Sequence, residues 1–352
     1  MKIAIVCAER SNNSMGRAYS LWLLAKELGW SAVVISTIGE QLWKPLRGTG
    51  FEKDLVKSKP SEVQTHPAYE TADVIVIVKP HPESLGRLLH DVEQGLKPFI
   101  LDIDDPDLEV RLSWASPARR IVRELRRPED FRLLRRMQRV ARSMPTTVSN
   151  PWLQNRYGGA LIPHVRHDPG RGSPPRGPVN IAFVGTNRPH KGVELLRSAV
   201  AELHNDGFTL TITDVAPSDA QPWENWVGET SLTDGMNLVA ASDLVVIPSV
   251  RGGWARGQFP VKIVDAMMME RPVIVSNVPP LPWAIDDSRA VFRAGSRRSL
   301  VRTLQTVAPS RVRAEMGARN RARALATFSV EAVAPRFAEA VYAALRHERP
   351  AR

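Results

Sequence analysis

The sequence lacks the features that mark a secreted or membrane-spanning protein. Cys7 is its one cysteine, which excludes a disulfide framework or a thiolate metal cluster and indicates a reducing compartment. Apolar runs stay well short of the roughly 20 residues that span a bilayer. The first ten residues turn polar after one short apolar stretch, so we expect no signal peptide. These absences predict a cytoplasmic protein, either in solution or at the inner face of the cell membrane.

Lysine is also scarce, so the formal charge of +11 is carried by arginine. Such charge attracts nucleic acid, anionic membranes or phosphorylated substrates, whereas a general preference for Arg codons would spread it over solvated helix faces. Aromatic side chains do not alternate with the basic ones, as they do in proteins that bind single-stranded nucleic acid. We therefore expect no nucleic-acid partner.

The 352 residues are enough for two domains with separate hydrophobic cores. Short apolar runs, such as 2–7, 74–78 and 99–103, alternate with helical patterns, which predicts parallel βαβ units. Residues 166–178 are rich in Pro and Gly and show no hydrophobic periodicity, which predicts a linker. The alternation then restarts, so we predict an α/β protein with Rossmann-like domains at 1–165 and 179–328.

The loops after the strands indicate what these domains bind. The first loop contains only Gly16 and lacks the G-x-G-x-x-G pattern of dinucleotide-binding domains, and no Walker loop is present. Residues 185–192, GTNRPHKG, join a strand to a helix and bring Arg188 and Lys191 to a helix N-terminus. This arrangement suits a diphosphate, although an ordinary turn with a solvated Lys191 would look the same.

With the segments that follow it, this loop resembles the donor-binding turn of the retaining GT-B glycosyltransferases of family 4 (group 1). There, a Gly is followed six residues later by a Lys-Gly pair, and Gly185 and Lys191 keep this spacing. Residues 241–277 resemble the family's strand, Pro-Ser, loop, helix and strand, while the first half of the chain agrees more weakly. The resemblance implies two facing domains with a cleft between them, and a helix in 329–352 that crosses back to the first domain.

The resemblance implies hexosyl or pentosyl transfer from a nucleotide-diphosphate sugar to an acceptor hydroxyl, with retention. It implies no cofactor and no metal, because cationic side chains neutralise the leaving diphosphate. The implied donor-binding residues are Gly16, Gly185, Thr186, Arg188, Lys191, Gly228, Phe259, Lys262 and Asp265. The implied acceptor-side or cleft residues are Ser14, His81 and His164.

The family that the chain resembles carries two glutamates eight residues apart, and this sequence has neither of them. Gly257 stands where the first, near the transferred sugar, is expected, and Asp265 takes the place of the second, which contacts the ribose. A variant in which Phe259-Pro260 and Lys262 precede the helix implies that Lys262 holds phosphate; the alternative is a solvated charge. Gly257 leaves open a second hypothesis, a degenerate GT-B protein that binds a nucleotide or a partner without transferring sugar.

Acidic residues replace a His that the family often carries after a strand of the first domain. The sequence FILDIDDPD puts Asp104 and Asp105 there, and we take these two as candidate catalytic residues. The four carboxylates of Asp102, Asp104, Asp105 and Asp107 could also hold a hard cation. The pattern is similar, too, to the nucleophile strand of haloacid-dehalogenase-like phosphatases, which normally opens its domain. The strand position of Asp102, which points its side chain into or across the sheet, argues against the cation.

Residues 111–142 hold eleven Arg and three acidic residues among regularly spaced apolar ones. Basic amphipathic helices of this kind lie on anionic membranes, as in lipid-modifying enzymes of the family that the chain resembles. A solvated face explains the pattern equally well, because Arg recurs at 293–323. The acceptor is thus either a small molecule or a lipid-linked glycan, with possible peripheral membrane contact through 111–142.

Overall fold

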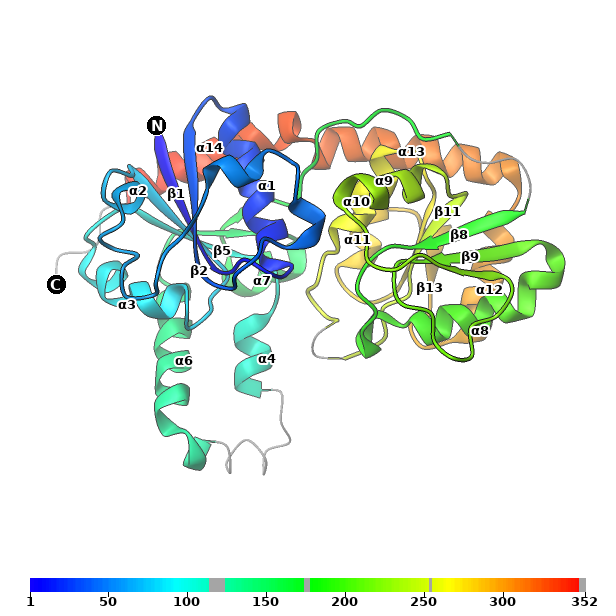
Figure 1. Ribbon diagram of the computed structural model, residues 1–352, viewed down its shortest axis with the longest axis horizontal. Helices are drawn as coiled ribbons and strands as arrows, with labels where there is room; N and C mark the ends of the chain where they lie inside the picture. The colour runs from blue at the N-terminus through cyan, green and yellow to red at the C-terminus, as the bar shows by residue number, and fades with distance from the viewer. Residues whose placement is uncertain (114–123, 174–177, 253–254, 348–352) are drawn as a thin grey trace. The chain divides into compact units, whose positions relative to one another are not determined.

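The computed structural model describes residues 1–113, 124–173, 178–252 and 255–347 (Figure 1). The chain divides into two compact units. The first comprises Met1–Val165 together with Val330–Arg352, and the second is Arg166–Ser329. Within the described ranges, no helix has the length and apolar character needed to cross a bilayer.

The first unit is built on a seven-stranded sheet in which all neighbouring strands are parallel. Its order is β3-β2-β1-β4-β5-β6-β7. The strands are β1 (Lys2–Glu9), β2 (Ser31–Ile38), β3 (Leu55–Lys57), β4 (Val74–Val78), β5 (Phe99–Ile103), β6 (Thr146–Val148) and β7 (Ala160–Leu161). All residues of β4 and β5 are buried, as expected where helices cover both faces of a parallel sheet.

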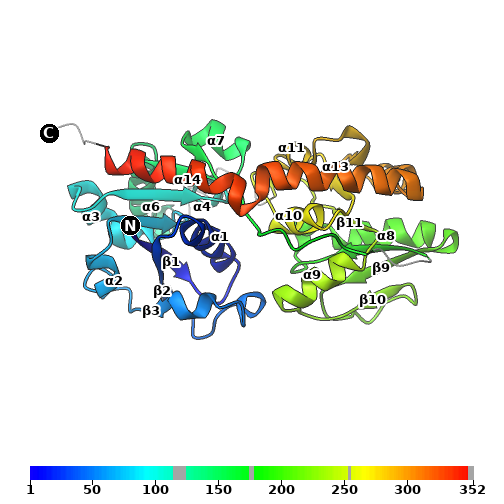
Figure 2. The ribbon, with the colours of Figure 1, turned by 90° about the horizontal axis from the view of Figure 1, so that it is seen from above.

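Helices pack against this sheet, and one of them comes from the far end of the chain. They are α1 (Ser14–Glu27), α2 (Pro67–Glu70), α3 (Leu85–Gln94), α4 (Asp107–Ser113), α6 (Pro128–Ala141), α7 (Pro151–Tyr157) and α14 (Val330–Leu345). Short 3₁₀ turns lie at Lys44–Leu46 and Phe51–Asp54. Helix α14 lies beside α1, where Phe337 and Tyr342 approach Trp30 (Figure 2).

The second unit has a six-stranded parallel sheet of the same design, in the order β10-β9-β8-β11-β12-β13. Its strands are β8 (Val179–Phe183), β9 (Phe208–Ile212), β10 (Glu224–Trp226), β11 (Leu244–Ile247), β12 (Val273–Ser276) and β13 (Val291–Phe292). Its helices are α8 (Val193–Leu203), α9 (Leu232–Ala240), α10 (Val261–Met268), α11 (Leu281–Ile285), α12 (Arg297–Val307) and α13 (Ser310–Phe328). Further 3₁₀ turns lie at Pro189–Lys191, His204–Asp206 and Ser288–Ala290.

In each unit the strand order reverses direction once, between β1 and β4 and between β8 and β11. Ligands of open α/β sheets bind beyond the carboxyl ends of the strands at such a reversal. The doubly wound α/β fold predicted from the sequence is confirmed. The loops after these four strands are therefore where a site is expected in each unit.

Residues 166–178, predicted as a linker, form loop structure in their described part and are grouped with the second unit. Gly172 is fixed there, because its amide donates to the Met269 carbonyl and its own carbonyl accepts from Arg271. Residues 174–177 lie outside the described residues.

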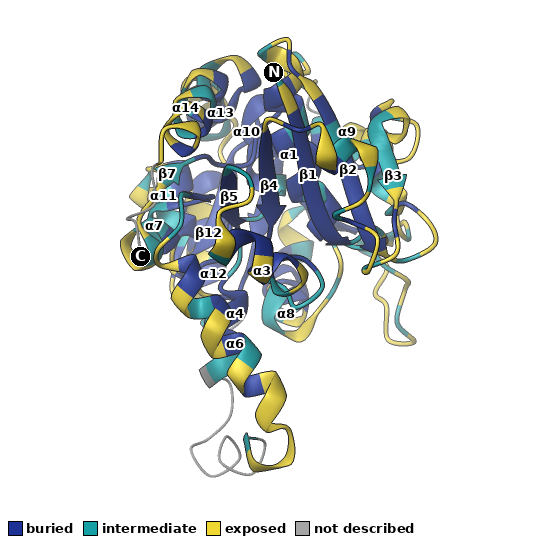
Figure 3. Ribbon diagram, turned by 90° about the vertical axis from the view of Figure 1, so that its left-hand side faces the viewer, coloured by how far each residue is buried: buried dark blue, intermediate teal, exposed yellow. Residues whose placement is uncertain are grey.

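Helix α6 extends away from the body of the first unit (Figure 1), and much of its surface is exposed (Figure 3). Its buried residues Phe131, Leu134, Met137 and Val140 recur at helical spacing and form the side that packs against α3 and α4. Most of its arginines lie on the exposed side. Residues 114–123 of the basic run 111–142 lie outside the described residues.

Candidate functional site

In the first unit, three carboxylates converge after β5. Asp104, Asp105 and Asp107 each offer an oxygen within 4.8 Å of the others. All three are largely buried, since they lie in the tight turn from β5 into α4. Asp102 points into the unit and accepts two hydrogen bonds, at 2.8 and 2.6 Å, from the fully buried guanidinium of Arg17, which also donates to the Ile162 carbonyl.

A lysine that follows the neighbouring strand β4 neutralises part of this charge. The Nζ atom of Lys79 donates to Asp105 and lies 3.2 Å from an Asp104 oxygen and 3.8 Å from an Asp107 oxygen. Burial raises the pKa of the Asp104 carboxyl to about 7, although Lys79 acts in the opposite direction. Burial also disfavours ionised Asp107, but Lys79, His81 and Arg111 outweigh it and lower its pKa to about 2.

The structure brings the two predicted histidines to the same carboxylates. Nε2 of His81 lies 3.8 Å from Asp107, and the Arg111 guanidinium lies 3.2 Å from its Nδ1. Nε2 of His164 lies 3.9 Å from Asp104, and its Nδ1 is 3.3 Å from the Ser20 hydroxyl. The sequence predicted the acidic cluster, Asp107 included, and the two histidines as separate features. It did not indicate that Lys79 and Arg111 join them.

Ser14 and Gly16 lie in the first turn of α1, after β1. Ser14 is buried, and its amide donates to the Asn12 side chain at 2.9 Å. Gly16 is half-buried, and a Cβ at this position would lie 3.2 Å from the Trp43 ring. The two residues stay predictions, since neither is shown to touch the acidic cluster.

In the second unit, the loop 185–192 is held against the end of β11. The Val250 amide donates to the His190 carbonyl, and the Gly185 amide donates to the Thr213 hydroxyl. Gly192 has φ of +74°, and a Cβ there would lie 2.1 Å from the Pro248 carbonyl oxygen, so only glycine fits. Gly192 is also the N-cap of α8, which directs that helix N-terminus toward the loop.

The cationic side chains of this loop differ in their contacts. Nζ of Lys191 donates to the Gln258 side chain at 3.2 Å, which links the loop to the segment that leads into α10. Arg188 and Thr186 are exposed at the outer part of the loop. The loop therefore presents a positive, half-exposed surface at the strand reversal between β8 and β11.

Asp265 lies in α10 and is fully buried, which the sequence did not indicate. Its carboxylate accepts from Nε of Arg166 at 2.8 Å, and Nζ of Lys262 lies 3.1 Å from its other oxygen. Burial alone would raise the pKa of Asp265, but Arg166 and Lys262 outweigh it and lower that pKa. Of the three side chains, Lys262 is the most exposed, at 18%.

The remaining predicted donor residues fall into two groups. The Phe259 ring is buried and packs on Trp283 and Phe328, and its donor contact stays a prediction. Gly257 is buried and offers no carboxylate. Gly228 follows β10 and borders a hollow of about 450 Å³, whose lining is Val227, Glu229, Thr230, Asp234, Asn237 and Leu238.

The two tryptophans before Gly228 belong to the structural framework. Trp223 stacks on His204 with ring centroids 3.8 Å apart. Trp226 donates to Glu224 and lies under the Arg197 guanidinium. Contacts within the second unit therefore hold both rings in place.

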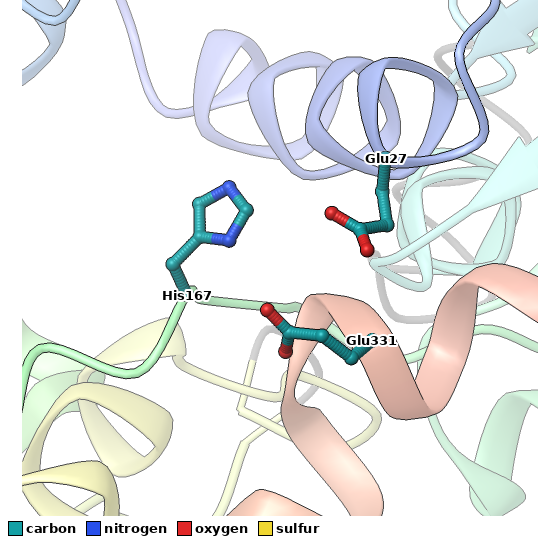
Figure 4. Close-up of side chains that lie close together, drawn as sticks. All are labelled: Glu27, His167 and Glu331. Atoms are coloured by element: carbon teal, nitrogen blue, oxygen red, sulfur yellow. The ribbon is translucent and has the colours of Figure 1, made fainter.

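Carboxylates also approach one another at the surface of the first unit. Glu27 is the last residue of α1 and Glu331 the second residue of α14 (Figure 4), and a carboxylate oxygen of each lies within 4.8 Å of the other. Both are exposed, and His167, drawn in the same figure, belongs to the second unit. We assign no metal site to this pair, since two exposed carboxylates are too few ligands for a hard cation.

Comparison with known proteins adds a family resemblance over part of the chain and a fold shared by the whole chain. Residues 178–308 match the family model described as "Glycosyl transferases group 1". A search of curated proteins found no match. This stretch contains the loop 185–192 and the segment through α10, which carry the cationic surface of the second unit.

Solved structures similar to the whole chain share its fold at low sequence identity. Sucrose-phosphate synthase from Thermosynechococcus elongatus is 15% identical with a TM-score of 0.69, covering 98% of this chain and 99% of that one. HepE from Anabaena, solved with UDP-glucose, is 15% identical with a TM-score of 0.71, covering 97% and 100%. A glycosyltransferase from Rickettsia africae is 12% identical with a TM-score of 0.67, covering 99% of both chains. The chain therefore has the GT-B fold and resembles the group 1 glycosyltransferases, as its sequence predicted.

Proposed function

We propose that the protein is a glycosyltransferase that moves a sugar from a nucleotide-diphosphate sugar to an acceptor hydroxyl, with retention and without a metal. The observation that carries this proposal is the loop 185–192, fixed beside β11 by Gly192, with Lys191 and the N-terminus of α8 at one place. The group 1 match includes this loop, and the UDP-glucose complex of HepE supports the class of donor.

The chemistry asked of this surface is stabilisation of a leaving diphosphate. As the glycosidic bond lengthens, negative charge grows on the phosphate oxygens and the sugar approaches an oxocarbenium ion. Lys191 and Lys262 supply positive charge, Arg188 adds to it from the exposed part of the loop, and the α8 N-terminus offers amide groups. Fixed cations in these positions supply the charge that a metal would bring, so the proposed reaction needs none.

The nucleoside part is assigned to the edge of the second sheet. The hollow beside Gly228 is large enough for a base, and Asn237 and Asp234 provide polar groups at its wall. Asp265 is covered by its two cationic partners, so we propose that it serves ribose or phosphate binding by orienting Lys262. A direct ribose contact by Asp265 would require Lys262 to move aside.

The acceptor side is assigned to the acidic cluster of the first unit. Carboxylates accept hydrogen bonds from sugar hydroxyls, and Asp105 is the most exposed of the three. His81, with 24% of its side chain exposed, offers a second polar group at the same strand ends. Ser14 and His164 complete this proposed acceptor set, in which Asp104 and Asp105 are the candidate catalytic residues.

A thermal-shift screen tests the donor assignment, since a ligand that binds only the folded state raises its melting temperature. We expect nucleoside diphosphates and their sugars to raise it. Lys191→Ala should weaken their binding by roughly 10- to 150-fold, because a charge-assisted phosphate contact contributes about 1.5–3 kcal/mol. Lys59→Ala, at an exposed pair with Glu62 in the first unit, is the matched control. Equal affinities in both variants would remove Lys191 from the donor site.

A second candidate function is a GT-B protein that binds nucleotide without transferring sugar. Gly257 favours it, because the position that the family resemblance assigns to a sugar-contacting carboxylate has no side chain. This candidate would be favoured if the protein binds the donor but shows neither sugar transfer nor slow hydrolysis of the donor. Hydrolysis of a bound nucleotide sugar that stops in Lys191→Ala would favour the transferase.

We further propose that α6 contacts an anionic membrane if the acceptor is lipid-linked. Its exposed arginines, with the 77% exposed Leu125 before the helix, give a basic surface with an apolar tip. Each Arg near such a surface contributes about 1 kcal/mol, and salt weakens the attraction. Sedimentation with phosphatidylglycerol vesicles at low salt should capture the protein, and Arg132→Glu with Arg139→Glu should release it. No capture would leave α6 as a solvated face and favour a small-molecule acceptor.

A further inference from the structure

The ammonium of Lys79 lies among the three carboxylates that follow β5, in the way a bound cation would. Its Nζ donates to Asp105, is 3.2 Å from Asp104 Oδ1 and is 3.8 Å from Asp107 Oδ2. Lys79 is 4% exposed, and the side chains of Asp104 and Asp107 are 6% and 7% exposed. Water therefore has little access to this charge cluster.

The backbone of Lys79 is held in an uncommon conformation that directs the side chain to this place. Its φ is +63°, in the left-handed region that residues with a side chain rarely adopt. The Lys79 amide donates to the Asp102 carbonyl at 2.9 Å, and the Lys79 carbonyl accepts from the Ser84 hydroxyl at 2.6 Å. Contacts on both sides of the residue thus maintain the strained backbone.

The carboxylates are not fully satisfied by hydrogen bonds. Among the described residues, Asp104 Oδ1 and Asp107 Oδ2 have no hydrogen-bond donor, although both are buried and near Nζ of Lys79. Burial would lower the pKa of Lys79, yet the three carboxylates together raise it well above its usual value. Charge attraction rather than directed hydrogen bonding therefore holds much of this cluster together.

We propose that Lys79 is the resident cation of this acidic turn: its ammonium takes the place of a divalent metal ion and positions Asp104 and Asp105. The cation role is independent of the proposed function. The consequence for Asp104 and Asp105 as candidate catalytic residues rests on that function. Lys79 is a positioning residue in this account, since it acts on the acceptor side through the two aspartates.

Carboxylate oxygens within 4.8 Å of one another are a ligand set that Mg²⁺ and Mn²⁺ accept once the ammonium is gone. Lys79→Met keeps the length and apolar stem of the side chain and removes its charge. The vacated, buried carboxylates then need either a divalent cation or protons. We expect the cation to bind at neutral pH, because one divalent ion can take an oxygen from each of the three converging carboxylates at once.

The test measures Mn²⁺ binding by electron paramagnetic resonance and melting temperature with and without Mn²⁺. Lys79→Met should bind one Mn²⁺ and gain about 5–10 °C at 100 times the dissociation constant. The wild type should do neither, and adding Asp105→Asn to Lys79→Met should abolish both effects. Lys57→Met, which removes an exposed partner of Glu40 in the same unit, is the matched control and should behave as wild type.

Three outcomes would overturn the proposal. One is an equal Mn²⁺ response in wild type and Lys79→Met, and another is no response in a folded Lys79→Met. The third concerns a Lys79→Met variant that does not fold without added metal. Refolding in the presence of Mn²⁺ should restore that variant. The proposal fails if Mn²⁺ does not restore it although the double variant, Lys79→Met with Asp105→Asn, folds. Because the readouts are metal binding and melting, a failed transferase assay leaves this test intact, and a failed metal test leaves donor binding intact.

Discussion

The buried carboxylate of Asp265 provides the sharpest test of how the second unit is built. Asp265→Asn keeps the size of the side chain and one acceptor oxygen for Arg166, but it removes the charge between Arg166 and Lys262. Breaking a buried ion pair costs about 3–5 kcal/mol. Since Asn retains one hydrogen bond, we expect a loss near the lower limit, about 3 kcal/mol.

For a unit of this size the loss corresponds to a melting temperature lower by about 6–12 °C. Circular dichroism during heating measures it, with Asp206→Asn as the control, because Asp206 is exposed in the turn after α8. The folded-state pKa of Asp265 is lowered, so its stabilisation is present above its unfolded pKa of about 3.9 and is lost as pH falls through the folded value. The difference between variant and wild type should therefore shrink in acid.

A different result would refute this reasoning. If the free energy of unfolding of Asp265→Asn lies within about 0.5 kcal/mol of the wild-type value, as it does for most surface substitutions, the ion pair does not stabilise the fold. A loss of nucleoside diphosphate affinity without loss of stability would instead support a direct ribose contact. A loss of both stability and nucleoside diphosphate affinity would support Asp265 as the residue that orients Lys262, provided that the double variant with Lys262→Ala loses less affinity than the sum of the two single variants.

Three further predictions follow from the geometry of the two units. Gly192→Ala should destabilise the second unit by at least about 2 kcal/mol and weaken donor binding, because its Cβ would meet the Pro248 carbonyl. Gly207→Ala is the control, since φ there is +83° but the space is open, and it should lower the free energy of unfolding by only about 1–2 kcal/mol. Chemical denaturation measures both losses, and equal losses would contradict the steric argument. Because the folded-state pKa of Asp104 is raised to about 7, its contribution to stability is greatest below its unfolded pKa and is lost as pH rises toward 7. Asp104→Asn should therefore reduce the fall in melting temperature over this pH range. A fall as steep as in the wild type would contradict this assignment. Donor turnover should survive EDTA, since the proposed mechanism neutralises the diphosphate with cationic side chains, and an activity that EDTA removes and Mg²⁺ restores would assign a metal to the reaction.

The alternation of apolar strands and helices predicted the fold class, because a parallel sheet needs crossover helices on its faces. The same logic indicated the loop after β8 as a binding loop, since the carboxyl ends of parallel strands share one edge of the sheet, and the family resemblance added the segment after β11. What the sequence could not supply is the pairing of charges across long separations. Arg166 and Asp265 are 99 residues apart, and nothing in a Pro-rich loop indicates that its arginine is buried.

Lys79 was missed for a related reason. A lysine after an apolar strand is usually a solvated end, and its burial depends on the turn after β5, 26 residues later. The signal that could have found it is the juxtaposition of a basic residue after β4 and an acidic run after β5, on strands that lie side by side. The burial of the Phe259 ring could not be predicted either, because it depends on Trp283 and Phe328 farther along the chain.

The return of α14 to the first unit has a consequence for how the protein forms during synthesis. The second unit is continuous in sequence, so it can finish folding while α1 still lacks the helix that covers it. At about 5–20 residues per second, the ribosome needs on the order of 10–40 s to pass from residue 166 to residue 345. Throughout that interval Trp30 lacks its contact with Phe337, so the first unit, whose sheet is synthesised before residue 166, is completed only after the second.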